Sequence, residues 1–600
     1  MNGKSTLYLL FAVVVLGLFI VFFERGSDST QARMEQAVRA FNFDPGSVTA
    51  LKVSSDNLNI ECRREKNIWI MKKPAGEPAD GGAVDEFLYR LSIVGRGETI
   101  TARQQTERNL KISDFGLEQP RIRIAVSDSA RETVYLLGAP TALGDAVYAA
   151  EEGRPDVFTA AAGVMDILPA SADRLRSRLL FQEDRSKVRQ IALHREAGFL
   201  QVERDKEGHW SLRQPVTGRA DRSRIYEWLD ELFKYEIADF TASDAGDAAS
   251  YGLADSPLHL SLVFNGDDTS RTLILGRATA ENSGLIYARR ADGSAVYTVP
   301  AALADLLRVN ESAWRERRLL PLAAHEINTV RMASGADVIE LNKGPAGLWT
   351  VAGLQPVAAD PERVKDLLSA WASVEIVEFN DAAGTNLAAF GLSPEKMRIS
   401  FFKEHDSPGS AFELLVSGAP PESGRVWVKA VPEPPLYRIP AAVIDRISLD
   451  RLYYRDRAVL AVDRAQVRSV MLKNAVREEM LQQDAVGKFE PVRPRPEKPD
   501  ELAVQKLLVG ISRLVAGRFV AEDPADLSRY GLDHPADEMT VGLSGRDGIS
   551  KTLMLGAETG GDSFYAMIKG QDIIFTLDRQ IRDSLFPSTL FAPAASGETR

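Results

Sequence analysis

Cysteine is almost absent from this sequence of 600 residues, and Cys62 is the single example. One thiol can form neither an intrachain disulfide nor a zinc site built from several cysteines. The six histidines are never spaced as in H-x-x-H or H-E-x-x-H, so the signature of a metal hydrolase is missing. We therefore predict no metal site and no cofactor. Cys62 follows the strand-like segment LNIE and fits an ordinary strand residue better than a nucleophile.

Blocks of basic residues are missing as well. Lysine and arginine total 73 against 84 aspartates and glutamates, which gives a formal net charge of −11. Neutralising nucleic-acid phosphates requires clustered positive charge, so we predict no nucleic-acid partner. The sequence also lacks the G-x-S-x-G and G-x-G-x-x-G patterns of hydrolases and dinucleotide-binding proteins. We predict no catalytic residues, and leave open a Ser/His/Asp site assembled from distant segments.

One long apolar run is present, LYLLFAVVVLGLFIVFF, from Leu7 to Phe23. About 17–20 apolar residues allow a helix to cross a bilayer, and no small-x-small cleavage site follows the run as in a signal peptide. We predict an uncleaved transmembrane helix at residues 7–23, after a cytoplasmic flank at 1–6 and before a juxtamembrane stalk at 24–43. Lys4 before the run and Arg25 after it give a weak charge bias, which favours the N-terminus inside.

A short pattern, an aromatic residue followed by Gly-Leu and then Pro, occurs four times. Its glycines are 136, 139 and 140 residues apart, and a Trp/Phe position and an Asp position recur at intervals of 139 to 141 residues. This period is too long for a solenoid unit but matches a whole domain. We predict four homologous domains, at residues 44–183, 184–323, 324–463 and 464–600. The repeated anchors are Trp69, Trp210, Trp349 and Phe489; Asp80, Asp221, Asp360 and Asp500; and Gly116, Gly252, Gly391 and Gly531.

Each domain is predicted to be α+β, with a mainly antiparallel sheet and one or two packed helices. After each anchor Asp, apolar residues at i, i+3, i+4 and i+7 define one face of a helix, and the Asp can cap its first turn. The other segments alternate apolar and polar residues between short turns, which is typical of antiparallel strands. The expected order is a meander carrying the Trp, the helix, the Gly turn, four more strands and a short closing helix.

Two kinds of anchor admit a structural and a binding interpretation. The glycine supplies a φ above zero in a turn, or the turn is a recognition loop. The Trp rings pack against the helix of their own domain, Trp210 near Trp228 and Trp349 near Trp371, or they form with the repeated tyrosines a platform on which a glycan stacks. We favour the structural interpretation for both, because aromatic residues at strand spacing are more often in the core.

Arginine pairs occur near the ends of the first three domains. The pairs follow three repeated aromatic residues, Phe158, Tyr297 and Tyr437, by 18 and 20 residues, and the fourth domain has no such pair. Because arginine carries five donors in a planar fork, one side chain can hold two surfaces together. We hypothesise that each pair helps to set the angle between consecutive domains; solvated arginines beside a linker are the alternative. The pairs are Arg176 and Arg178, Arg315 and Arg317, and Arg455 and Arg457.

The combined motifs resemble a bacterial family known as domain of unknown function 4340. They are Trp then Pro, Ala-Asp before a helix, Tyr-Gly-Leu-x-x-Pro, a strand ending in Leu-Gly, and Val-Tyr. The resemblance covers almost all of residues 44–590, as tandem copies, and the fourth copy departs from it with Phe489 in place of Trp. No catalytic residues are established for the family, so none is carried over.

The resemblance also implies a cellular setting. Members of this type tend to be envelope proteins, often associated with ABC-type transport systems like those of gliding motility. Four similar domains without a polar constellation suit a non-enzymatic scaffold in the bacterial inner membrane, with its repeats in the periplasm or outside. The resemblance implies that the scaffold is an accessory subunit of such a transport system, with ABC-type permease components as partners. A binding module for glycan, exported polymer or lipid is the alternative, and a hydrolase is a weaker one.

Overall fold

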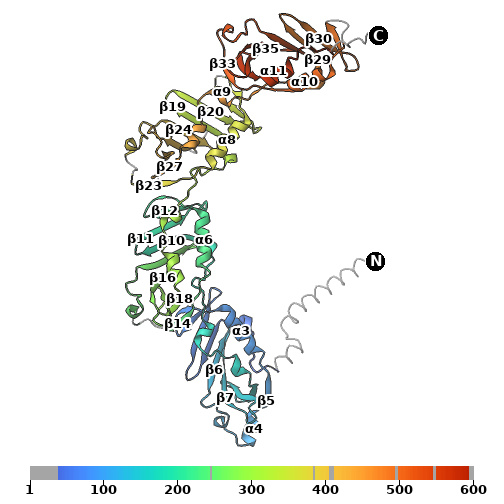
Figure 1. Cartoon of the computed structure of the whole chain (residues 1–600). Helices are drawn as coiled ribbons and strands as arrows, with labels where there is room; N and C mark the ends of the chain where they lie inside the picture. The colour runs from blue at the N-terminus through green and yellow to red at the C-terminus, as the bar shows by residue number, and fades with distance from the viewer. Residues whose placement is uncertain are drawn as a thin grey trace, which may run out of the picture. The chain divides into compact units, whose positions relative to one another are not determined.

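The computed structural model describes residues 38–592, except 243–245, 247, 354, 383–385, 405–410, 494–497 and 545–548. The predicted anchor at residues 7–23, its flank and most of the stalk lie outside the described residues. Across the described ranges, no helix combines the length and the apolar character needed to traverse a bilayer. The chain divides into two compact units, one ending at Arg315 and one starting at Glu316, and each holds two repeats (Figure 1).

Repeat 1 is built on one nine-stranded sheet in which every pairing is antiparallel. Its strands are β1 (Ala50–Ser54), β2 (Asn59–Glu65), β3 (Ile68–Lys73), β4 (Glu77–Pro78), β5 (Arg96–Ile100), β6 (Ile122–Ser127), β7 (Glu132–Pro140), β8 (Ala146–Glu151) and β9 (Val157–Ala161). Their order is β4-β3-β2-β1-β6-β7-β8-β9-β5. Leu51 of β1 lies opposite Cys62 of β2 on one side and Val126 of β6 on the other. The two halves of the repeat therefore meet at β1 and β6.

Repeats 2 and 3 have the same nine-strand order. The strands of repeat 2 are β10 (Val188–Arg195), β11 (Gly198–Arg204), β12 (Trp210–Gln214), β13 (Gly218–Arg219), β14 (Asp239–Ala242), β15 (Leu258–Phe264), β16 (Asp267–Ala278), β17 (Leu285–Arg290) and β18 (Val296–Pro300). Those of repeat 3 are β19 (Thr329–Ser334), β20 (Asp337–Lys343), β21 (Trp349–Val351), β22 (Val357–Ala358), β23 (Glu378–Asn380), β24 (Met397–Phe402), β25 (Ala411–Val416), β26 (Arg425–Val431) and β27 (Leu436–Pro440).

Repeat 4 keeps the order but has eight strands among its described residues. They are β29 (Val467–Asn474), β30 (Glu478–Gln483), β31 (Phe489–Arg493), β33 (Phe519–Glu522), β34 (Asp537–Leu543), β35 (Ser550–Glu558), β36 (Ser563–Ile568) and β37 (Ile573–Asp578). A separate two-stranded ladder joins β28 (Ala458–Ala461), on the segment that enters the repeat, to β32 (Arg513–Val515).

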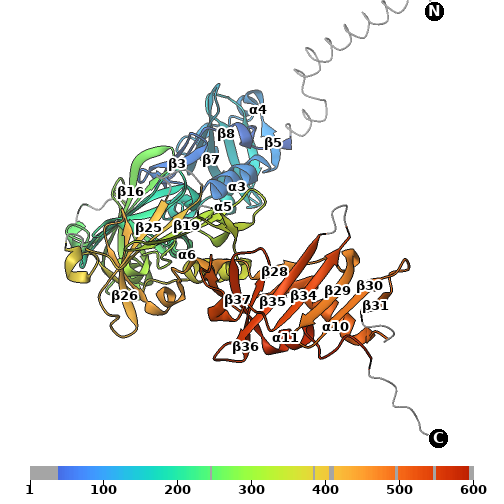
Figure 2. The same ribbon diagram turned by 90° about the horizontal axis from the view of Figure 1, so that it is seen from above.

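A long amphipathic helix crosses one face of each sheet, and shorter helices lie nearby. The long helices are α3 (Gly81–Ser92), α6 (Arg222–Leu232), α8 (Pro361–Ala372) and α10 (Glu501–Ser512). The short helices are α4 (Ala102–Glu107), α5 (Val164–Ile167), α7 (Ala302–Leu307), α9 (Arg451–Tyr454) and α11 (Arg579–Leu585). In repeat 4, α10 and α11 lie along the same side of the sheet (Figure 2).

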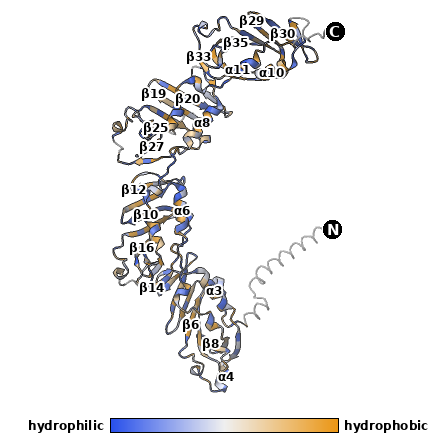
Figure 3. Ribbon diagram, viewed as in Figure 1, coloured by the Kyte–Doolittle hydropathy of each residue, from blue (hydrophilic) through white to orange (hydrophobic). Residues whose placement is uncertain are grey.

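Each repeat has its own hydrophobic core, between the helix and one face of the sheet. In α3 the buried side chains include Val84, Phe87, Leu88 and Leu91, which form a single stripe. Hydrophilic and hydrophobic residues alternate along the strands (Figure 3), as expected for antiparallel sheets with one face in water. The four principal cores draw their buried residues from 40–175, 180–314, 319–454 and 460–591.

Candidate functional site

The four anchor aspartates cap the four long helices. The Asp80 carboxylate accepts a hydrogen bond from the Ala83 backbone N–H, and Asp221 accepts bonds from Ser223 and Arg224. Asp360 and Asp500 make the same type of contact with the first turns of α8 and α10. Each cap satisfies N–H groups that the helix itself cannot pair. These aspartates therefore serve the fold of each repeat.

Trp69 and Trp210 lie against the helices of their own repeats, although Trp210 does not meet the ring expected beside it. Trp69 is buried, and its Nε1 donates to Asp85 of α3 at 2.9 Å. Trp210 is buried too, but its ring meets Tyr226 edge to face at 6.4 Å between centroids, rather than Trp228. The large Trp228 ring packs against the fully buried Trp314 instead, at 5.1 Å.

The third and fourth Trp/Phe positions are only partly covered. Trp349 and Phe489 are half-buried at the margins of their cores. Trp371, expected beside Trp349, has its ring 5.8 Å from that of Phe401. The aromatic positions of the repeat thus contribute to the cores, to different depths.

The Gly turns are fixed by close contact between two backbone segments. Gly116 has a φ of 66°, and a Cβ there would lie 2.8 Å from the Ala139 amide nitrogen. On the facing strand, a Cβ on Gly138 would lie 2.2 Å from the Phe115 carbonyl oxygen, so neither position accepts a side chain without movement. The Phe115 ring then packs edge to face on Tyr148, at 5.0 Å.

A pair of aromatic rings equivalent to Phe115 and Tyr148 closes the Gly turn in every repeat. The other pairs are Tyr251 with Tyr287, Phe390 with Trp427, and Tyr530 with Tyr565. All four lie in small satellite cores at the far end of the sheet from the Trp. The structure therefore gives the repeated turn aromatics a packing role.

The linker between repeats 1 and 2 is held by its arginine pair. The Arg176 guanidinium lies 2.6 Å from a Glu77 oxygen within repeat 1, and both side chains are almost wholly buried. The same guanidinium lies over the Phe240 ring of repeat 2, 3.8 Å from its centroid. Arg178 donates to the carbonyl oxygens of Ile237 and Ala238 of repeat 2. The pair therefore contacts both repeats.

Backbone hydrogen bonds join the same linker to both repeats. On the repeat 1 side, the Ser177 N–H donates to the Pro78 carbonyl at 3.1 Å. On the repeat 2 side, the Ile237 N–H donates to the Arg178 carbonyl at 2.8 Å. Because successive linker residues pair with different repeats, the linker has little freedom to rotate.

The linker between repeats 3 and 4 uses its arginines in a related way. Arg455 lies 2.9 Å from one oxygen of Glu522 in repeat 4, and Arg451 lies 2.9 Å from the other. Arg457 donates through Nε to Asp360, the helix cap of repeat 3, at 3.0 Å. The Ala516 N–H of repeat 4 donates to the Arg457 carbonyl at 2.7 Å.

The middle pair falls on the division between the two units. Within the first unit, Arg315 is buried and its backbone bridges to that of Ala220. Within the second unit, Arg317 donates to the Ile376 carbonyl at 3.3 Å and lies over the Phe379 ring. The Arg315 bridge matches that of Arg176 with Ala79, and the Arg317 bond matches that of Arg178 with the Ile237 carbonyl.

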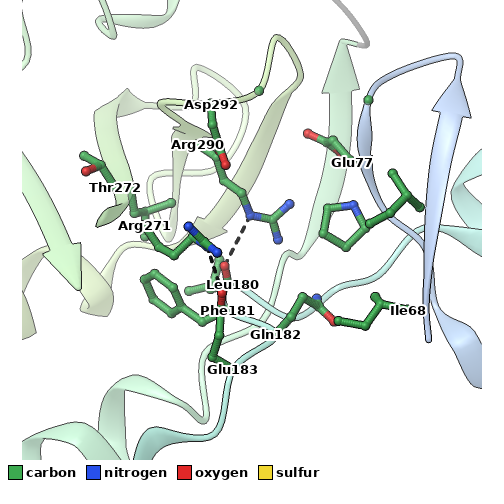
Figure 4. A pocket seen from close by; sticks show the side chains of 15 residues that line it. Ile68, Glu77, Leu180, Phe181, Gln182, Glu183, Arg271, Thr272, Arg290 and Asp292 are labelled. Atoms are coloured by element: carbon green, nitrogen blue, oxygen red, sulfur yellow. Dashed lines mark hydrogen bonds and ion pairs between the residues drawn. The ribbon is translucent and has the colours of Figure 1, made fainter. Parts of the chain in front are cut away.

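A pocket opens where repeats 1 and 2 meet, beside the first arginine pair (Figure 4). Its volume is about 220 Å³. Repeat 1 contributes residues of β3 and β4, including Glu77, and repeat 2 contributes the linker end, β16 and β17. Arg290 donates to the backbone carbonyls of Leu179 and Leu180, and Arg271 binds the Glu183 carboxylate at 2.8 Å. This pocket is the strongest candidate for a binding site.

Cys62, His194 and His259, which are of types that commonly act in catalysis, lie outside this pocket, and their surroundings indicate a structural role. Cys62 is fully buried in β2, and burial raises the pKa of its thiol to about 12, which disfavours the nucleophilic thiolate. His194 and His259 face each other across β10 and β15. The pKa of His259 is lowered mainly by its burial and also by the charge of the neighbouring His194. Over the described part of the chain, no group of three or more potential metal ligands is found.

No curated protein and no solved structure matches this chain. A family model described as Domain of unknown function (DUF4340) matches four times, at residues 69–241, 210–349, 349–487 and 492–591. The matches agree in number with the four repeated sheets, although the first three run from one repeat into the next, and together they span most of the sequence. The chain therefore belongs to the family described as Domain of unknown function, DUF4340.

Proposed function

We propose that this protein is a non-enzymatic scaffold, held in a membrane by its N-terminal segment. The observation that carries the proposal is the linker between repeats 1 and 2, which binds both repeats through a buried ion pair, an arginine–aromatic contact and backbone hydrogen bonds. Such a linker fixes two domains in one arrangement, which suits a protein that holds partners at defined positions. The apolar run from Leu7 to Phe23 supports the anchor.

The setting that we propose is the bacterial inner membrane, with the repeats in the periplasm. The family resemblance supports a role as an accessory subunit of an ABC-type transport system similar to those of gliding motility. Permease components of such a system would be the partners. The second candidate is a binding module for glycan, exported polymer or lipid, and the pocket between repeats 1 and 2 favours it.

Affinity purification of the full chain from detergent-solubilised membranes tests the scaffold proposal. We expect integral membrane subunits of a transporter to copurify, and a chain lacking residues 1–43 to lose them. Recovery of the intact chain without any membrane-protein partner would contradict the proposal.

The position of the N-terminus tests the anchor separately. We expect the membrane-bound protein to begin at or near Met1 and protease added to spheroplasts to digest the repeats. An N-terminus near Ser27, or protection of the repeats in spheroplasts, would overturn the proposed anchor and its orientation.

A further inference from the structure

The pocket between repeats 1 and 2 has an apolar interior and a few polar groups. Its apolar lining comes from both repeats: Ile68, Ile70 and Pro78 of repeat 1, and Leu180, Phe181 and Leu273 of repeat 2. A volume of about 220 Å³ is larger than the roughly 150 Å³ apolar cavity that holds benzene in an engineered protein. The pocket is therefore large enough for a molecule of one aromatic ring and a substituent.

The polar group that distinguishes this pocket is the carboxylate of Glu77. The residue is 3% exposed, and one of its oxygens binds Arg176 at 2.6 Å. The other oxygen, Oε1, is buried and has no hydrogen-bond partner among the described residues. A buried acceptor left unpaired costs about 1–3 kcal/mol, and more when it is charged. Oε1 therefore offers a strong site for a donor that enters the pocket.

The corresponding junction in the second unit shows that an open carboxylate oxygen is not required to join two repeats. There, Arg455 and Arg451 occupy both oxygens of Glu522, each at 2.9 Å. The position of Glu77, three residues before the helix cap, is Gly218 in repeat 2, Val357 in repeat 3 and Glu497 in repeat 4. Among the three repeats that are followed by another repeat, only repeat 1 has a carboxylate at this position.

A second buried polar group lies at the same junction. The Tyr297 hydroxyl is buried and has no hydrogen-bond partner in the described structure. Burial raises the pKa of Tyr297; nearby Arg290 lowers it, while Glu77 raises it. The hydroxyl therefore stays protonated and lies within electrostatic reach of the pocket residues. Tyr297 is not among the residues that line the pocket, so Glu77 Oε1 is the unpaired group that a ligand would meet.

We propose that this pocket binds a neutral small molecule with an apolar body and one O–H or N–H donor, which the molecule gives to Glu77 Oε1. A neutral ligand is favoured because Arg176 already balances the Glu77 charge, and Arg271 and Arg290 also line or flank the site. Figure 4 shows the Arg290 guanidinium between Glu77 of repeat 1 and Leu180 of the linker. A ligand oxygen at this place can accept a hydrogen bond from Arg290. Since the walls come from both repeats, the ligand stabilises their contact. This inference does not depend on the scaffold function.

Phenol and anisole are suitable probes because they have nearly the same shape and only phenol carries a donor. Titrating the full chain with each, followed by ligand-observed NMR, should show saturable phenol binding that is about ten-fold or more tighter than anisole binding, as expected for a hydrogen bond to a charged group. Phenol should also raise the unfolding temperature of repeats 1 and 2. Equal affinities, or no saturable phenol binding, would overturn the proposal; water alone would then occupy the pocket.

A variant that fills the pocket locates the binding. A Cβ on Gly293 would lie 3.6 Å from Glu77 Oε1, so Gly293→Leu places a side chain in the ligand's position. Gly560→Leu is the matched control, because a Cβ there meets nothing within 4 Å. We expect the first variant to lose at least ten-fold in phenol affinity and the control to keep it. Unchanged binding in a folded Gly293→Leu chain would place phenol elsewhere and contradict the assignment.

Discussion

At the scale of single residues, two requirements recur: glycine where backbones touch, and a partner for every buried charge. Gly138 has no room for a Cβ because of the Phe115 carbonyl, 2.2 Å from where it would lie. Arg176 and Glu77 share one buried contact, so removing either side chain leaves the other charge unpaired. Losing one partner of such a pair typically destabilises a protein by about 3–5 kcal/mol.

The glycine requirement can be tested by comparing two repeats. A Cβ on Gly418, the glycine that follows β25 in repeat 3, would meet its nearest neighbours at 3.7 Å, an ordinary contact. We expect Gly138→Ala to destabilise the β6–β7 ladder by about 1–3 kcal/mol, as for overpacking, and Gly418→Ala to change β24–β25 little. Hydrogen exchange with mass spectrometry measures both. Equal protection losses would show that the close contact at Gly138 is relieved cheaply.

The buried thiol gives a pH-dependent prediction. Because burial raises the pKa of Cys62 to about 12, the thiol of folded repeat 1 stays protonated at pH 9, whereas an unfolded chain has a substantial thiolate fraction. Iodoacetamide should alkylate the denatured chain at pH 9 at least about a hundred-fold faster than the native one. Rapid alkylation of native protein, with repeat 1 still folded by circular dichroism, would contradict the burial of this residue.

At the scale of elements, each repeat combines features that sequence patterns predict with one that they do not. The long helices begin after their Asp caps because apolar spacing and capping are local signals. The edge strand β5 was not predicted: its RGETI sequence has no apolar alternation, and it pairs with β9 far along the chain. Long-range pairing of a polar strand leaves no local signature.

The helix caps provide a prediction at this scale. Asp80 has only a capping role, whereas Asp360 also accepts from Arg457 at 3.0 Å. We expect Asp80→Ala to cost about 1 kcal/mol and Asp80→Asn almost nothing, since Asn caps as well as Asp. Asp360→Asn should still cost about 1 kcal/mol, at the low end for a charged hydrogen bond, because Arg457 is 36% exposed and solvent screens it.

Amide exchange in α3 and α8 measures these losses. If Asp360→Asn were as neutral as Asp80→Asn, the bond to Arg457 would contribute nothing to repeat 3.

At the scale of the whole molecule, the chain consists of two units of two repeats, each repeat with its own core. The fourfold repetition could be predicted because its anchors recur at a fixed interval. The pocket could not, because its lining residues, such as Glu77 and Arg290, come together from two repeats and leave no local signal in the sequence. Only the arginine pairs pointed from the sequence to the junctions.

The central claim is that the arginine-bearing linker holds repeats 1 and 2 in one arrangement. Its most direct test is the distance distribution between spin labels at the exposed positions Ser129 and Ser283, one in each repeat, measured by pulsed electron paramagnetic resonance. We predict one narrow distribution, broadened in Arg178→Ala, which loses the bonds to Ile237 and Ala238. The exposed Arg103→Ala should leave it unchanged. A broad distribution in the parent chain, or no effect of Arg178→Ala, would contradict the claim.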